Sequence, residues 1–353
     1  MIVSFVCPSV RTPVGGVTAL YEFANGLSRR GHEVHIAHGS PQARGWGERI
    51  TGLDDIAWFS FEPGVQHHFG PEDVIPLPPA DFIFGTGAGR EYGLPVLIVQ
   101  GFEMFPKEFE REVFRTPCLK VCIAGWLIAA GVSYGAPEDS FVHVPMGIDL
   151  DLFRVVEPIE TRPLRVGMLC NSHPQKGWVI GLKALELVHE RLPEMRAVVF
   201  GNTTPPEQLP DWIGFVFDPA PEVLVNDVYN QCSVFLQSSF YEGFGFTAIE
   251  AMACGCALVS TDNGGSDDYA LPGRTALVAP PGDAEALARH VESLLRDDEL
   301  RVQLARAGRE YVQRFNWDRA AELLEQHLEE YLADPERFLA PPLDGEPASG
   351  VAP

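Results

Sequence analysis

YEGFGFTAIEAMACG, residues 241–255, is flanked by two short apolar runs, SVFLQSS at 233–239 and CALVST at 256–261. Both runs have the length and composition of buried strands, and the apolar stretch 247–255 between them is typical of a helix. A helix that joins two buried strands forms a βαβ unit of a parallel sheet. This stretch therefore indicates an α/β fold.

The same alternation of strand and helix extends in both directions along the chain. Strand-like runs are predicted at 2–9, 32–38, 81–87, 95–100, 120–125, 141–146, 164–171, 195–202 and 275–281, and helical stretches at 17–31, 178–192, from Asp283 onward and at 316–332. A proline-bearing connection at 157–163 interrupts the series. We therefore expect two Rossmann-like domains facing one another across a cleft, residues 1–157 and 158–315. The proline-rich segment 335–353 is predicted to be a disordered tail.

Composition and charge narrow the class of protein. The chain has 353 residues, a net charge of −23, 46% hydrophobic and 21% charged residues, as in an ordinary globular protein of two domains. An acidic surface repels nucleic acid and anionic lipid, so neither is an expected partner. The seven cysteines lie mostly in apolar runs and are predicted to be reduced and buried. No signal peptide or apolar span of about 20 residues is found, which predicts no integral membrane segment and a cytoplasmic protein.

The segment 241–255 also carries the residues with a chemical role. Glu242 stands in a glycine-flanked loop, and Glu250 follows after seven residues in the opening turn of the helix. Backbone amides at the start of that helix, at Phe246 and Thr247, are predicted to hold a diphosphate at the positive end of the helix dipole. Carboxylates accept hydrogen bonds from vicinal hydroxyls, which suits Glu242 for a transferred sugar and Glu250 for a ribose.

With its Glu-x7-Glu pattern, its internal Gly-Phe-Gly and the Ala-Met-Ala-Cys-Gly that follows, the sequence resembles the retaining glycosyltransferases of family four, which have the GT-B fold. Other stretches agree in order and spacing, among them TPVGGV at 12–17, HPQKG at 173–177 and NGGSDDY at 263–269, where Asp268 takes the place of a family glutamate. The resemblance covers nearly all of residues 1–332. It implies that the helix 316–334 crosses back to pack on the first domain.

The resemblance implies roles for individual residues. Lys176 and Glu242 are the expected catalytic residues, and Lys176 would stabilise the negative charge that grows on the leaving diphosphate. The family arginine five positions before this lysine is replaced by Asn171, and Arg11 or an amide donor could take over its role. The expected donor-binding residues are Gly15, Gly16, Asn171, Gly243, Phe244, Gly245, Phe246, Thr247 and Glu250.

The acceptor side departs from the common family pattern. Many members carry a histidine near the reacting sugar, and this chain has VQGFEMF at 99–105 in that place. Gln100 and Glu103 are the polar residues available there. The pattern Gln-x-Phe-Glu resembles the rhamnosyltransferase-like subgroup.

Together these observations predict a retaining, metal-independent transferase that uses a nucleotide-diphosphate sugar as co-substrate and no cofactor. UDP, GDP and TDP remain open as the donor nucleotide, and a soluble small metabolite or glycan is the expected acceptor. Two other classes compete with this interpretation. A catalytically silent nucleotide-sugar-binding protein would share the motifs, whereas an NAD-dependent oxidoreductase is disfavoured because VGGVTA at 14–19 is not G-x-G-x-x-G.

Two further motifs invite a metal-site interpretation. Asp149-Leu-Asp151 has the Asp-x-Asp form that holds a divalent metal in another glycosyltransferase fold. Because they lie at the domain hinge, we expect a capping or hinge role for these aspartates instead. His67-His68 is predicted to be a loop pair rather than a metal site, because no acidic or cysteine partner is near in sequence.

Overall fold

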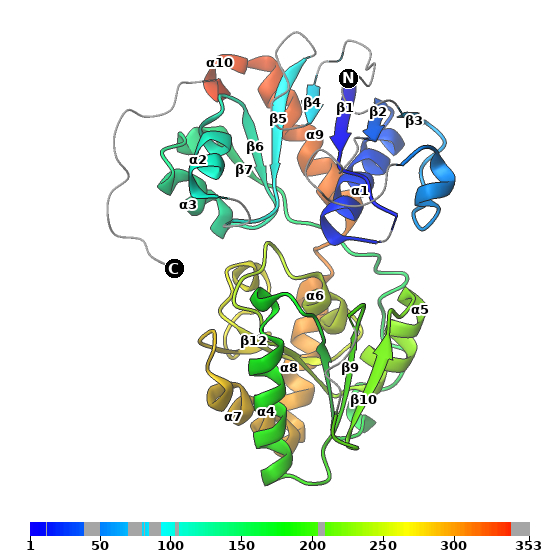
Figure 1. Ribbon diagram of the computed structural model, residues 1–353, viewed down its shortest axis with the longest axis vertical. Coiled ribbons are helices and arrows are strands. Elements are labelled where there is room, and N and C mark those ends of the chain that lie inside the picture. The colour runs from blue at the N-terminus through cyan, green and yellow to red at the C-terminus, as the bar shows by residue number, and fades with distance from the viewer. Residues whose placement is uncertain are drawn as a thin grey trace. The chain divides into compact units, whose positions relative to one another are not determined.

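The computed structural model describes residues 1–11, 13–38, 50–69, 80, 82–84, 93–102, 106–203 and 209–339 (Figure 1). The chain divides into two compact units. The first unit contains Met1–Gly147 together with Trp317–Pro353, and the second contains Ile148–Asn316. Each unit is an α/β structure around a parallel sheet, as the sequence predicts.

The sheet of the first unit has seven parallel strands in the order β3-β2-β1-β4-β5-β6-β7. The strands are β1 (Ile2–Cys7), β2 (Glu33–His38), β3 (Val65–His68), β4 (Phe82–Phe84), β5 (Leu94–Val99), β6 (Leu119–Cys122) and β7 (Phe141–His143). The helices are α1 (Gly15–Arg29), α2 (Lys107–Arg115) and α3 (Trp126–Ser133). Val3 pairs with Val34 on one side and with Phe82 on the other, so β1 is an interior strand at the point where the strand order reverses.

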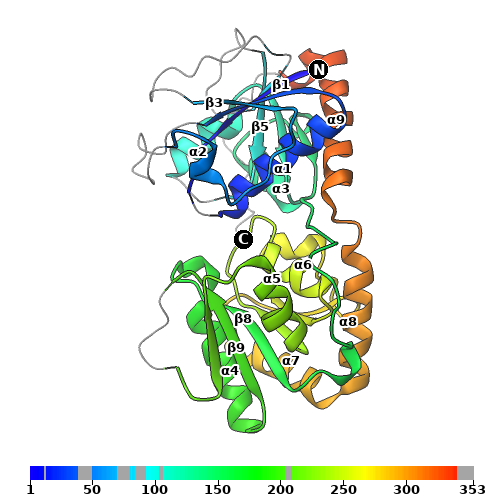
Figure 2. The ribbon, with the colours of Figure 1, turned by 90° about the vertical axis from the view of Figure 1, so that its right-hand side faces the viewer.

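The last helices of the chain belong to the first unit. Helix α9 (Trp317–Ala333) packs against α1, and its Leu324, Leu328 and Tyr331 are part of the first unit's hydrophobic core (Figure 2). The Tyr331 hydroxyl donates to the Pro95 carbonyl at 3.2 Å.

The expectation of a disordered tail from residue 335 is wrong for its first part. Pro335–Phe338 form the short helix α10, and Phe338 is only 1% exposed. Pro335 is preset for the first position of a helix, and the apolar Phe338 and Leu339 are buried in the core of the first unit. The rest of the expected tail, from residue 340, lies outside the described residues.

The sheet of the second unit has six parallel strands in the order β10-β9-β8-β11-β12-β13. They are β8 (Arg165–Leu169), β9 (Arg196–Gly201), β10 (Ile213–Phe217), β11 (Val234–Gln237), β12 (Ala257–Thr261) and β13 (Ala276–Ala279). The helices are α4 (Trp178–Arg191), α5 (Pro221–Val223), α6 (Phe246–Ala253), α7 (Ala284–Arg296) and α8 (Asp298–Val312). The predicted long helix from Asp283 is thus two helices, because the Asp297 carboxylate accepts the Leu300 amide and caps the second one.

The boundary between the units falls after Gly147 rather than at Glu157. The connecting segment is fastened to the second unit, because the Asn230 side chain accepts the amides of Val156 and Glu157 at 2.7 and 3.2 Å. Buried Arg162 donates to several backbone carbonyls there, including Cys254 at 2.6 Å. These contacts make the proline-bearing connection an integral part of the second unit.

Gly177 joins the turn after β8 to α4 in a left-handed conformation, with φ of 62°. A Cβ atom at this position would lie 2.0 Å from the backbone carbonyl oxygen of Ser238. Only glycine therefore permits both the turn and its close approach to the chain that follows β11.

His67 and His68 do not lie in a loop but form the end of β3, because that strand pairs with β2 at the edge of the sheet. His67 Nδ1 lies 2.9 Å from Nε2 of the buried His38, and His68 Nε2 lies 2.9 Å from His35 Nδ1. Burial, and to a smaller extent the neighbouring His67 and His68, lowers the pKa of His38 to about 3. The Ser9 hydroxyl lies 2.7 Å from the other ring nitrogen of His38.

Acid should destabilise the first unit through His38. The unfolded chain binds a proton at this histidine below a pH of about 6.5, whereas the folded chain does not until a pH of about 3. The free energy of unfolding should therefore fall by about 2 kcal/mol between pH 7 and pH 5 through this residue. Urea denaturation of His38→Gln should show a pH dependence shallower by about that amount. Equal pH dependence in both proteins would contradict the assignment.

Alanine substitutions at two left-handed glycines, Gly177 and Gly273, distinguish the cost of backbone strain from the cost of a steric clash. Gly273→Ala has only the backbone cost of about 1 kcal/mol, because a Cβ there meets nothing within 4 Å. Gly177→Ala should lose at least about 2 kcal/mol more, since a backbone carbonyl must move. Denaturant unfolding of the full chain measures both losses, and equal losses would show that the approach to Ser238 is not tight.

Candidate active site

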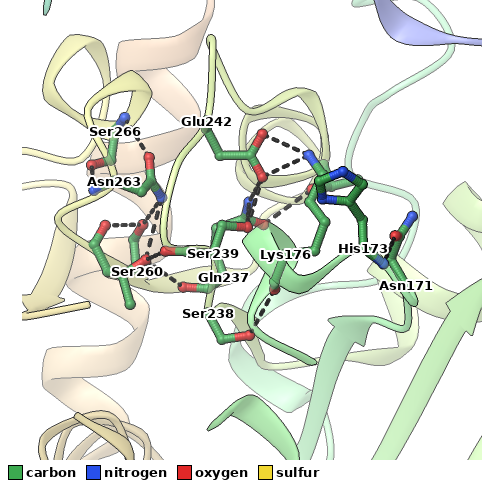
Figure 3. A network of polar contacts seen from close by, with 12 residues as sticks. Asn171, His173, Lys176, Gln237, Ser238, Ser239, Glu242, Ser260, Asn263 and Ser266 are labelled. Atoms are coloured by element: carbon green, nitrogen blue, oxygen red, sulfur yellow. Dashed lines mark hydrogen bonds and ion pairs between the residues drawn. The ribbon is translucent and has the colours of Figure 1, made fainter. Parts of the chain in front are cut away.

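Three neighbouring strands of the second unit, β8, β11 and β12, bring their carboxyl ends to one edge of the sheet. The turn after β8 carries Lys176, the loop after β11 carries Glu242, and the loop after β12 carries Asn263 (Figure 3). Ligands of open α/β sheets bind at this edge. The sheet order therefore assembles side chains that are far apart in the sequence.

The centre of this cluster is an ion pair between Lys176 and Glu242. The Lys176 Nζ lies 2.9 Å from Oε1 and 2.8 Å from Oε2 of the carboxylate. The Glu242 side chain is 7% exposed, whereas that of Lys176 is 33% exposed. Two neutral donors also reach Oε1, the Gln237 amide at 2.8 Å and the Ser239 hydroxyl at 2.7 Å. A buried carboxylate thus has its charge compensated and its position fixed.

The backbone of Glu242 is fixed by the loop after β12. Its amide donates to the Asn263 carbonyl at 2.9 Å, and its carbonyl accepts the Gly265 amide at 3.1 Å. The buried Asn263 side chain accepts the Ser266 amide at 3.0 Å and so closes this loop (Figure 3). Asp268, in the position of the family glutamate, ends the short helical turn 265–268 of the same loop.

The predicted donor-binding run 243–247 leads directly into α6. Gly245 has φ of 106°, and among the described residues no side chain caps the helix. The start of α6 is the positive end of the helix dipole, which favours an anion. Phe244 is buried against Tyr269 and Phe315, so only its backbone remains for a ligand. The Thr247 hydroxyl donates to Gln237 Oε1 at 3.1 Å.

Glu250 lies past the first turn of α6, not in the opening turn as predicted. The Tyr229 hydroxyl donates to its Oε2 at 2.8 Å. Burial raises the pKa of Glu250 to about 7, against the opposing effect of the Tyr229 hydrogen bond. This carboxyl group is therefore poised to gain or lose a proton near neutral pH.

The remaining predicted residues make contacts of their own within each unit. Asn171 belongs to the connection between β8 and Lys176, where its side chain accepts the His173 amide at 2.8 Å. Gly16 and Gln100 meet in the first unit, where the Gln100 amide donates to the Gly16 carbonyl at 3.1 Å. Gly15 begins α1 beside them. Glu103 lies outside the described residues.

Arg11, considered above as a substitute for the missing arginine, makes an ion pair with Asp55 at 2.9 Å. The Asp149 side chain accepts the amides of Asp151 and Leu152, both at 3.0 Å, which confirms its capping role. Among the described residues no group of three or more His, Cys, Asp or Glu side chains is placed to hold a metal.

The cysteines and the hydropathy of the helices bear on two further expectations. All seven cysteines are buried and free, as predicted. No helix in the described part of the chain is long and apolar enough to cross a bilayer.

The sequence interpretation missed Gln237, Ser239 and Tyr229. Gln237 and Ser239 stand at the carboxyl end of the apolar run 233–239, where polar side chains in a parallel sheet commonly belong to a site. That position was the available signal. Tyr229 lies far from Glu250 in sequence, so no local pattern links the two residues.

The second unit is similar in sequence to a known protein family. Residues 151–311 match the family described as "Glycosyl transferases group 1". The D-inositol 3-phosphate glycosyltransferase of Corynebacterium glutamicum (strain R) is 26% identical over 228 residues, which cover 57% of this chain and 54% of that protein. The chain thus spans about half the length of this curated relative.

Solved structures show a similar fold over nearly the whole chain. Sucrose-phosphate synthase from Thermosynechococcus elongatus has a TM-score of 0.73 at 18% identity, covering 94% of this chain and 99% of that one. Anabaena HepE in complex with UDP and glucose has a TM-score of 0.69 at 17% identity, covering 93% and 99%. Residues 151–311 are therefore similar in sequence to the group 1 glycosyl transferases, and nearly the whole chain has the GT-B fold of these solved structures.

Proposed function

We propose that the protein transfers a sugar from a nucleoside-diphosphate sugar to a hydroxyl acceptor. The observation that carries this proposal is the buried Glu242 carboxylate held beside Lys176, next to the uncapped start of α6. A cation and helix amides suit a diphosphate, and a fixed carboxylate suits sugar hydroxyls. The names of the relatives support the same class of reaction, and HepE binds UDP.

Each group has a distinct role in the proposed reaction. Lys176 and the first amides of α6 bind the diphosphate and stabilise the charge that develops as it leaves. Glu242 accepts hydrogen bonds from the transferred sugar, and Glu250 accepts them from the ribose. Because Asn171 replaces an arginine, the α6 amides carry a larger share of phosphate binding than in a site with two cations.

We propose retention of configuration without a metal ion. The bond between the sugar carbon and the phosphate oxygen breaks, and the acceptor oxygen forms its bond to the same face of that carbon. The proton of the acceptor hydroxyl passes to an oxygen of the leaving diphosphate. Gln100 and Glu103 are the proposed acceptor-side residues, and Gly15 and Gly16 are proposed to bind the donor. The net charge of −23 favours an acceptor away from anionic membrane surfaces, such as a small metabolite or glycan in the cytoplasm.

Removing either member of the ion pair should abolish most of the activity. We expect Glu242→Ala and Lys176→Ala each to lower transfer by about 100-fold or more, because each loses a charge that contacts the donor. Release of nucleoside diphosphate from UDP-, GDP- and TDP-sugars measures the effect. Lys183→Ala, an exposed lysine of the same unit, is the matched control and should keep full activity.

The wild-type result also separates the competing classes. Donor affinity without any turnover in the wild type would favour the silent binding protein. Near-normal turnover in both Glu242→Ala and Lys176→Ala would contradict the proposed roles.

Glu250 should make donor binding depend on pH. The carboxylate accepts ribose hydroxyls, whereas the protonated form has lost one acceptor site, so affinity should fall by up to about tenfold per pH unit below a pH of about 7. Calorimetry with the preferred sugar nucleotide from pH 5.5 to 8 measures this, and its diphosphate does not titrate in that range. Glu250→Gln should bind with an affinity that is flat over the same range. A wild-type affinity that is equally flat would refute the ribose role.

A further inference from the structure

The two oxygens of the Glu242 carboxylate have unequal sets of partners. Oε1 accepts from Lys176, Gln237 and Ser239, at 2.9, 2.8 and 2.7 Å. Within the described part of the chain, Oε2 accepts from Lys176 alone, at 2.8 Å. When the lysine moves away, Oε1 keeps two donors and Oε2 becomes available.

The exposed fractions of Lys176 and Glu242 predict which of the two side chains moves. Lys176 is one-third exposed and has a flexible four-carbon stem, whereas Glu242 is 7% exposed. A diphosphate with its negative charges draws the ammonium group toward itself. The carboxylate would then be buried without its cation, a state that is costly unless other donors remain.

Gln237 is built to supply such a donor. Its side chain is buried, with 2% of its surface exposed. Its Oε1 accepts from the Thr247 hydroxyl at 3.1 Å, which directs its amide nitrogen toward Glu242 Oε1 and Ser239 Oγ at 2.8 and 3.1 Å. Thr247 thus fixes the orientation of the amide, and Gln237 couples the first turn of α6 to the carboxylate.

Ser239 completes the arrangement. Its hydroxyl accepts from Gln237 and donates to Glu242 Oε1, so both groups point toward the same oxygen (Figure 3). Its backbone carbonyl accepts the Thr261 hydroxyl at 2.5 Å, which fastens this segment to β12. Both donors therefore stand on rigid, buried parts of the sheet edge.

We propose that Gln237, assisted by Ser239, is a positioning residue that holds Glu242 in place when Lys176 leaves it for the donor diphosphate. Oε2 is then the oxygen that accepts the hydrogen bond from the transferred sugar. This inference rests on the proposed function for the identity of the ligand. Whether Gln237 and Ser239 hold Glu242 in place without Lys176 does not depend on the identity of the ligand.

A crystal structure of the Lys176→Met variant tests the holding directly and needs no donor. We expect Glu242 Oε1 to remain within hydrogen-bonding distance of Gln237 and Ser239. In the Lys176→Met, Gln237→Met double variant the carboxylate should leave this position. A carboxylate that swings away in the single variant, or that stays in the double variant, overturns the proposal.

Kinetics of Gln237→Met test the consequence for the sugar. Methionine keeps the length of the side chain and removes the amide donor. With whichever of the UDP-, GDP- and TDP-sugars the wild type uses, we expect kcat to fall by about tenfold to a hundredfold, the range typical of a misplaced catalytic group. The affinity for the matching nucleoside diphosphate should stay within about twofold, because Lys176 and the α6 amides are intact. Gln313→Met, at an exposed position after α8, is the control.

The outcomes of these experiments are distinguishable. Normal kcat in Gln237→Met, or equal losses of kcat and of nucleoside diphosphate affinity, overturns the positioning role. Absence of turnover and of donor binding in the wild type instead refutes the proposed function. In that case the two crystal structures still decide whether Gln237 holds Glu242.

Discussion

The buried carboxylate of Glu242 is the constraint on which the candidate site depends. A charge with 7% of its side chain exposed must be matched by donors, and here they come from the turn after β8, from β11 and from the segment that follows it. The loop after β12 supplies the backbone contacts of the same residue. Because these three strands are neighbours in the sheet, the strand order is itself a requirement for the site.

Local patterns in the sequence account for most of the fold and for the charged residues of the site. The apolar runs predict the strands of the second unit except the edge strand β10, since a strand buried on both faces is apolar throughout. Lys176, Glu242 and the start of α6 follow from the motif at 241–255 and its family resemblance. The structure brings the first two into direct contact, although sixty-six positions separate them in sequence.

The features that escaped prediction depend on tertiary contacts. In the sequence, Gln237 is only the end of an apolar run. Its proposed positioning role follows from its contacts with Thr247 and Glu242, which the fold brings to either side of it. His67 and His68 look like a polar loop pair until β2 places histidines opposite them. Pro335 reads as the start of disorder, but the burial of Phe338 makes it the start of a helix.

In the proposed reaction, a single lysine links donor binding to the state of Glu242. The same ammonium group cannot neutralise the carboxylate and a diphosphate fully at once, so a bound donor competes with Glu242 for it. In the proposed exchange, the neutral donors Gln237 and Ser239 lower the cost of leaving the carboxylate without its cation.

The long-range field of a protein with a net charge of −23 disfavours an anionic donor, but salt screens it beyond about 8 Å. Binding is therefore decided by the groups within contact distance. In the proposed reaction, the start of α6 and Lys176 have separate tasks. The helix start holds the phosphate throughout, and Lys176 follows the charge as it develops.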